Sequence, residues 1–257
     1  MSEITALAER AVGTQAGLRA RIERELRGNI LPFWSAHVVD HSKGGFYGAL
    51  SNSLYLRDDQ PRSAVLCARI LWTYAEAYRL YRHAGYLATA RHALDALCNH
   101  FWDARNGGVH WMLDPFNRPL STRKHTYAQA FAIYGLAAFH RATGDAVSLH
   151  LARTRFVLLE RHAHDLRHGG YIEGCAGEWG ALADMRLSDK EPNCRKSMNT
   201  LLHVMEAYTA LLHVWEHPRL RRRLAELVHI FLDRVIDYET ASFHLFFDDA
   251  WNTLTAP

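Results

Sequence analysis

The sequence lacks the patterns that mark most metal and redox proteins. Its four cysteines show no CxxC pair or other metal spacing, and its 17 histidines contain no HExxH motif. We therefore expect no metal site. Cys67 and Cys98 fall within helical patterns, which predicts that both are buried thiols.

Long apolar runs and blocks of charge are also missing. No apolar stretch reaches the ~20 residues that a bilayer span requires, and charges occur throughout the first thirty residues. The sequence thus predicts no membrane association and a reducing, cytoplasmic location. The net charge is +3, and the one basic run, "RLRRR" at Arg219–Arg223, is predicted to form a solvated face. Nucleic-acid binding is therefore not expected.

A long internal repeat is present instead. The 257 residues, 49% of them apolar, have an ordinary globular composition. Double glycines open three similar segments, "GGFYG" at Gly44, "GGVHW" at Gly107 and "GGYIEG" at Gly169, spaced by 63 and 62 residues. A weaker fourth copy, "FHLFFDDAW" from Phe243, lacks the glycines. This period indicates a repeated supersecondary unit.

Between these segments the hydrophobic periodicity is helical. Pro32 should end or kink the first helix, and Pro61 suits the opening turn of the second. Seven helices are predicted, at residues 16–31, 61–83, 86–102, 123–142, 146–163, 196–215 and 219–236.

The predicted helices are of two kinds. "SLHLARTRFVLLERHAHDL" is amphipathic, so His162 and His164 are expected to be exposed, whereas "SAVLCARILWTYAEAY" and "TYAQAFAIYGLAAF" are apolar almost all round. Alternation of half-exposed and buried helices indicates two concentric layers. We predict an all-α toroid, a single domain over residues 1–257. A stacked solenoid such as TPR has a much shorter period.

Polar residues interrupt the inner helices, and a buried polar group is more informative than a buried apolar one. Taken singly, each could be a satisfied core group, and a buried guanidinium needs a partner or a polar ligand. Because three successive inner helices carry such groups, we favour a polar cleft at their axis. These residues are Arg69, Tyr127, Gln129, Asn199, His203 and Glu206.

Two loops predicted to lie above this cleft combine aromatic and charged residues. "HWMLD" contains Trp111, and "EWGALADMRLSDKE" contains Asp184, Arg186, Asp189 and Glu191. Such mixtures suit sugar rings, which present apolar C–H faces and a rim of hydroxyls. The second loop could equally be a solvated crossover held by its own salt bridges.

Specific motifs resemble those of cellobiose 2-epimerases, within the N-acylglucosamine 2-epimerase superfamily. The matching stretches run from about Asn29 to Trp251. They include "NILPFW", "GGFYG", "ARILWTYAEAYR", "GGVHWMLD", "RPLSTRKHTYAQAFAIYGL", "RATGD", "DMRLSDK", "KSMNT" and "FFDDAW".

The resemblance implies an (α/α)6 barrel that inverts C2 of a reducing-end glucose unit to give mannose, without a metal or other cofactor. By motif it assigns Arg69, Tyr127, Asn199 and His203 to the reacting sugar, and Glu191 to the second sugar. We expect His203, Arg69 and Tyr127 to act in catalysis. The substrate-binding candidates are Asn199, Trp111, Asp184, Arg186, Glu191 and Glu206.

The chemistry accounts for these residue types. The C2 proton becomes acidic when the ring opens and C1 is a carbonyl, and its removal gives an enediolate that fixed cations and hydrogen-bond donors stabilise. Imidazoles suit the proton transfers because their pKa lies near the working pH.

The sequence departs from the family at its end. The family's acid/base histidines lie in "GHDxE" and "PYHNGR" type segments after "FFDxxW", and this chain ends six residues beyond Trp251. Seven helices are predicted where the barrel has twelve, and six ~62-residue units need roughly 370 residues. We expect the first four repeats of a longer enzyme, inactive alone, which is poorly soluble or associates with a complementary segment.

Other functions remain open at this point. One is a catalytically dead carbohydrate-binding or interaction remnant. Another is a mannose isomerase or N-acylglucosamine 2-epimerase of the same superfamily. A glycoside hydrolase using Asp184 and Asp189 is disfavoured, because both carboxylates lie on one loop rather than on opposite walls.

Overall fold

The computed structural model describes residues 17–254, so the start of the first predicted helix at residue 16 lies outside the described residues. Seven helical segments occur where seven were predicted. They are residues 17–25 with η1 (Leu26–Ile30) and α2 (Leu31–His37), α3 (Ala64–Tyr81), α4 (Ala84–Ala96) with η2 (Leu97–Phe101), α5 (Thr126–Thr143), α6 (Ala146–His162), α7 (Met198–Leu212), and α8 (Pro218–Ile230) with η3 (Phe231–Val235).

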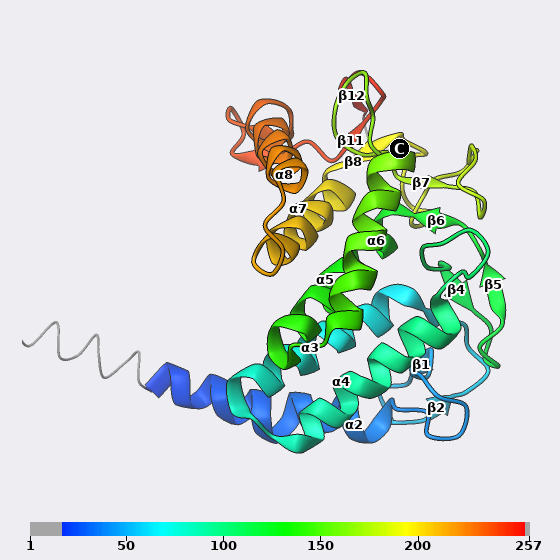
Figure 1. The fold of residues 1–257 in the computed structure, drawn as a ribbon, viewed down its shortest axis with the longest axis vertical. Coiled ribbons are helices and arrows are strands. Elements are labelled where there is room, and N and C mark those ends of the chain that lie inside the picture. Colours follow the sequence, from blue (N-terminus) through cyan, green and yellow to red (C-terminus); the bar gives the residue numbers. More distant parts are fainter. Residues whose placement is uncertain (1–16, 255–257) are drawn as a thin grey trace, which may run out of the picture.

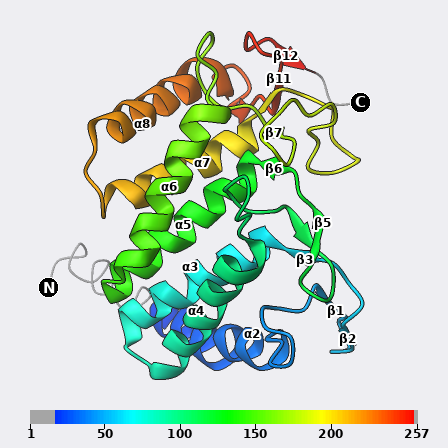
Figure 2. The same ribbon diagram turned by 45° about the vertical axis from the view of Figure 1, so that its right-hand side comes forward.

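The helices form two layers along an arc (Figures 1 and 2). Helices α3, α5 and α7 lie side by side on the inside, and α4, α6 and α8 pack outside them. Helix α5 is buried along most of its length. Gly135 permits its close approach to α3, because a Cβ there would lie 2.7 Å from the carbonyl oxygen of Ala68. The predicted two-layered all-α architecture is confirmed.

Two predicted helix boundaries are wrong. The first helix does not end at Pro32. A π-turn over Leu26–Ile30, in which the Leu31 N–H bonds to the Leu26 carbonyl, precedes the proline, and the helix continues to His37. Pro61 does not open the second helix. It precedes a short strand, β3, and α3 begins at Ala64.

Short strands, which the sequence did not predict, lie on the loop side. The sheets β3-β4-β5, β6-β7 and β8-β11-β12 join successive units, and β1-β2 and β9-β10 are hairpins within one unit. Their bounds are β1 (Ala49–Leu50), β2 (Leu56–Arg57), β3 (Arg62–Ser63), β4 (Met112–Leu113), β5 (Pro119–Ser121), β6 (Lys124–His125), β7 (Gly174–Cys175), β8 (Lys196–Ser197), β9 (Ile236–Asp237), β10 (Ser242–Phe243), β11 (Phe246–Phe247) and β12 (Thr253–Leu254).

Each of the first three units contains what we call a joint, an aspartate whose side chain is at most 14% exposed, paired with a cation that immediately precedes the inner helix. The aspartate begins the double-glycine loop and accepts backbone N–H groups within it. The cationic side chains are at most 3% exposed. The pairs are Arg62–Asp40 at 2.5 Å, Lys124–Asp103 at 2.6 Å and Lys196–Asp165 at 2.7 Å.

A side chain from the hairpin of the following unit closes each joint. Asn117 donates to the Lys43 carbonyl at 2.6 Å, and the indoles of Trp179 and Trp251 donate to the corresponding carbonyls of Asn106 and His168. Glycine is required beneath each indole. A Cβ on Gly108 or Gly170 would lie 2.8 or 2.7 Å from the indole.

The fourth copy predicted without glycines is confirmed as a loop of the same kind. Phe243 pairs with Ile236, as Tyr171 pairs with His164 in the third unit. Ala241 takes the left-handed conformation (φ 52°) that the first glycine has in the other loops.

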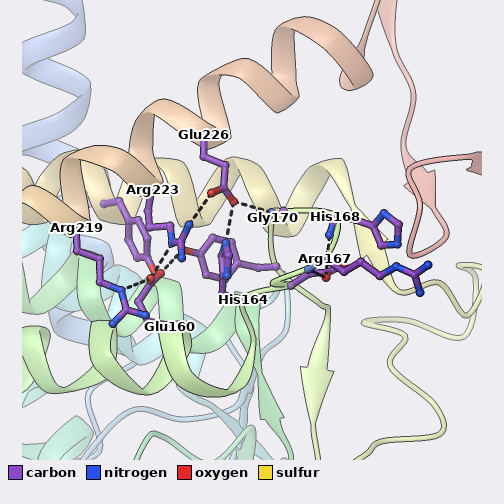
Figure 3. A network of polar contacts seen from close by, with 12 residues as sticks. Glu160, His164, Arg167, His168, Gly170, Arg219, Arg223 and Glu226 are labelled. Atoms are coloured by element: carbon purple, nitrogen blue, oxygen red, sulfur yellow. Dashed lines mark hydrogen bonds and ion pairs between the residues drawn. The ribbon is translucent and has the colours of Figure 1, made fainter.

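A buried carboxylate ties α8 to the layer beneath it (Figure 3). Glu160 of α6 accepts hydrogen bonds from Arg219 and Arg223, each at 2.9 Å, and from the hydroxyls of Tyr171 and Tyr208. The "RLRRR" run is therefore only partly the solvated face that was predicted. Two of its arginines satisfy a carboxylate that has no access to water.

His164 also differs from its prediction. Its ring is buried and bonds to Glu226 at 2.8 Å, which in turn accepts the N–H of Gly170 (Figure 3).

Among the helices of residues 17–254, none combines the length and apolar composition that crossing a bilayer would need.

The joint predicts the effect of removing one cation. Lys196 donates to Asp165 and to the carbonyls of Gly169 and Asp249 at 2.7–2.9 Å. Lys196→Met should lower the free energy of unfolding by about 3–5 kcal/mol, because it leaves Asp165 as an uncompensated charge. Denaturant unfolding measures the loss. Lys190→Met, in an exposed loop, is the matched control, and an equal effect of both variants would refute this role of the joint.

Candidate functional site

A line of contacts crosses the three inner helices. The guanidinium of Arg69 (α3) lies 5.5 Å from the ring centre of Phe131 (α5). The imidazole of His203 (α7) lies 4.5 Å from Phe131 and 4.8 Å from Tyr127, both on α5. The structure therefore places Arg69, Tyr127 and His203 on one shared face, as the sequence analysis expected of the inner helices.

His203 is oriented by its own helix. Its Nδ1 lies 2.6 Å from a carboxylate oxygen of Glu206, one turn further along α7. This contact leaves Nε2 as the ring nitrogen available to a ligand, and it favours a proton on Nδ1.

Charges converge on the hydroxyl of Tyr127. Burial raises the pKa of this phenol above its ordinary value, Arg69 opposes the rise, and Glu206 and Glu191 add to it. Tyr127 is thus held as a neutral hydrogen-bond donor next to a cation.

Asn199 and Glu191 lie on the loop side of the same face. Both border a cavity of about 200 Å³ that is also lined by Leu187, Leu245 and Phe246. The half-buried Asn199 stands in the first turn of α7, four residues before His203.

The remaining predicted sugar contacts are already engaged with protein. The ring of Trp111 lies 5.0 Å from the guanidinium of Arg123 and 4.9 Å from the ring of His125. Asp184 and Arg186 pair with each other at 2.7 Å on an exposed loop. The structure thus holds this pair in the local salt bridge that the alternative interpretation described, and no described contact joins it to Tyr127 or His203.

Two expectations about polar residues on the inner helices are wrong. Arg69 is exposed rather than buried, because among residues 17–254 no element covers the groove between α2 and α3 that it borders. Gln129 does not face a cleft. Its amide bonds to the backbone N–H and carbonyl of Val109, each at 2.8 Å, so it is a structural residue.

Sequence reasoning missed Glu173, which is buried between the starts of α5 and α7. One carboxylate oxygen accepts from the Thr200 hydroxyl at 2.8 Å, and the other has no partner among the described residues. Burial raises the pKa of Glu173 to about 7, although hydrogen bonds from Thr200 and Ser197 lower it. The repeat could have drawn attention to Glu173, because Glu173 in "GGYIEG" occupies the position of Trp111, a predicted sugar contact, in "GGVHW".

This arrangement suits stabilisation of an oxyanion. A solvent-accessible guanidinium, a phenol and an imidazole lie within the first two turns of α3, α5 and α7, and a cation and hydrogen-bond donors stabilise developing negative charge. The fold and this face define an α/α-barrel protein with a line of polar side chains at the loop end of its inner helices.

Known proteins agree with this class. Residues 45–257 match the family described as N-acylglucosamine 2-epimerase (GlcNAc 2-epimerase). The cellobiose 2-epimerase of Bacteroides fragilis is 44% identical over 236 residues, covering 92% of this chain and 60% of that protein. The structure of cellobiose 2-epimerase from Spirochaeta thermophila matches with a TM-score of 0.88 at 35% identity, covering 95% of this chain and 60% of that chain. D-mannose isomerase of Marinomonas mediterranea is 23% identical over 215 residues, 81% of this chain and 48% of that protein.

The chain belongs to the N-acylglucosamine 2-epimerase family. The solved structures that it resembles include cellobiose 2-epimerases, which are isomerases with an (α/α)6 barrel, so the predicted fold class is confirmed. The chain spans about 60% of the length of the cellobiose 2-epimerases of Bacteroides fragilis and Ruminococcus albus.

Glu173 predicts an unusual pH dependence of stability. Its pKa rises from an ordinary 4.5 to about 7 on folding, so the folded state binds the extra proton between these values. Stability should fall as pH rises from about 4.5 to 7, by up to about 3 kcal/mol. Glu173→Gln should remove this fall. Unfolding curves at pH 5, 6 and 7.5 test it.

Glu178→Gln, in an exposed turn, is the control for this measurement and should behave like the unmodified chain. Parallel pH profiles for the unmodified chain and Glu173→Gln would show that Glu173 does not carry the effect.

Proposed function

We propose that this chain forms one wall of the active site of a carbohydrate 2-epimerase that converts the reducing-end glucose of cellobiose-type β-1,4 disaccharides to mannose. The observation that carries the proposal is the contact line from Arg69 through Phe131 to Tyr127 and His203 across three inner helices. Relatives that are 44% and 36% identical to this chain are named cellobiose 2-epimerases.

Each residue has a role in the proposed reaction. Arg69 and Tyr127 stabilise the negative charge that develops on O1 and O2 of the enediolate once the C2 proton is removed. His203, oriented by Glu206, holds the open-chain sugar and exchanges protons with its oxygens through Nε2. Asn199 binds the same sugar from the first turn of α7.

The second sugar is assigned to the loop side of the cavity. Glu191 borders the cavity beside Asn199, and its carboxylate would accept hydrogen bonds from sugar hydroxyls there. Trp111, Asp184 and Arg186 contribute at the rim once a ligand competes for their present partners.

Inversion at C2 requires a base that takes the C2 proton, and protonation of the opposite face either by a second acid/base group or after the intermediate rotates. We assign these proton transfers at C2 to the part of the barrel that this chain does not supply, where the resemblance places the family's acid/base histidines. The chain is thus proposed to be the first four repeats of the barrel, inactive alone and completed by a complementary segment. A non-catalytic binding remnant remains the alternative, and it predicts sugar binding without turnover.

The function is tested with a fusion. The part of the Bacteroides fragilis epimerase beyond its matched residues is joined after Pro257 and incubated with cellobiose in D₂O. NMR should show glucosyl-mannose with deuterium at C2. Arg69→Ala should lower kcat about 10²- to 10³-fold, as expected for loss of an oxyanion-stabilising group.

Arg79→Ala, on the same helix but paired with Glu76, is the matched control and should leave kcat within about twofold. Release of free glucose would instead indicate hydrolysis. Equal rates for both variants would exclude Arg69 from the reaction.

A further inference from the structure

The fourth unit carries a joint that is only half made. Asp237 begins the fourth loop and accepts the N–H of Glu239 and of Thr240, as Asp165 accepts the loop amides of the third unit. Within residues 17–254, however, Asp237 has no lysine or arginine partner, whereas each of the three equivalent aspartates has one at 2.5–2.7 Å.

The spacing explains where the missing cation must come from. The cation follows its aspartate by 22 residues in the first unit, 21 in the second and 31 in the third. The same spacings from Asp237 lead to positions 258, 259 and 268, which lie outside the described residues.

The apolar side chain that follows Asp237 in this loop is also less covered than its equivalents in the other units. The residue six positions after the aspartate is buried in the first three units, as Phe46, Val109 and Tyr171, with exposed fractions of 0–4%. The equivalent Phe243 is 52% exposed. Figures 1 and 2 place this unit at one end of the arc, where no further helix of residues 17–254 covers it.

We propose that the loop 237–242 is the receiving half of a fourth joint, and that its occupant is the next inner helix of the barrel with a lysine or arginine immediately before it. The choice of occupant rests on the completion of the barrel proposed above. The carboxylate of Asp237 binds the incoming cation, and the arriving helix buries Phe243.

The test compares melting temperatures of the unfused chain and of the fusion with the Bacteroides fragilis segment. Asp237→Asn retains an oxygen acceptor for the loop N–H groups but removes the charge. It should lower the melting temperature of the fusion by roughly 5–10 °C, as expected for one broken buried pair, and leave the unfused chain within about 1 °C. Asp233→Asn, an exposed carboxylate four residues away, is the matched control and should change neither protein.

Several results would overturn the proposal. One is an equal effect of Asp237→Asn on both proteins, or no effect on the fusion. Another is a fusion no more stable than the unfused chain. A third is self-association of the unfused chain that Asp237→Asn abolishes while the fusion is unaffected, which would make a second copy the occupant. Because melting requires no sugar, a stable, Asp237-dependent fusion without epimerase activity would refute only the proposed function.

Discussion

The buried aspartate–cation pair of each joint is the interaction on which the rest of this structure depends. Burying two charges costs more than their mutual attraction returns unless both partners make further hydrogen bonds. Here they do: Asp165 also accepts two loop amides, and Lys196 also donates to two carbonyls, one of them in the hairpin of the next unit. The pair thereby fixes the start of an inner helix against its own loop and against the following unit.

This constraint positions the candidate site. Tyr127 and Asn199 each stand three residues after the cation of their joint, and Arg69 stands seven after Arg62. They therefore project from the first two turns of adjacent inner helices at the end where the helix dipoles are positive. Holding the helix starts in register aligns a phenol, an amide and a guanidinium on neighbouring helices. A reaction that develops negative charge would use both contributions.

The sequence predicted what depends on periodicity and little of what depends on individual partners. The 62-residue repeat and the change from amphipathic to fully apolar helices were sufficient for the helices and their layers. Strands of two residues have no hydrophobic period, so their pairing could not be read. Arg223 and Glu173 were misjudged or missed because their environments depend on groups distant in sequence, Glu160 and the start of α7. Gln129 was predicted to be a cleft residue because the sequence does not distinguish a glutamine that binds backbone groups from one that binds a ligand.

The exposure of Arg69 results from the open arc, and its burial on closure of the barrel would affect the proposed reaction. Its side chain borders the groove between α2 and α3 and also reaches Phe131 in the contact line. An element that fills this groove to close the barrel would bury the guanidinium, and a buried guanidinium needs an opposing negative or polar group. Within residues 17–254 Arg69 has no carboxylate in ion-pair contact. An enediolate bound between Arg69 and Tyr127 would supply that negative group. Burial of Arg69 by barrel closure would therefore make the guanidinium bind the charged intermediate more strongly than the neutral substrate.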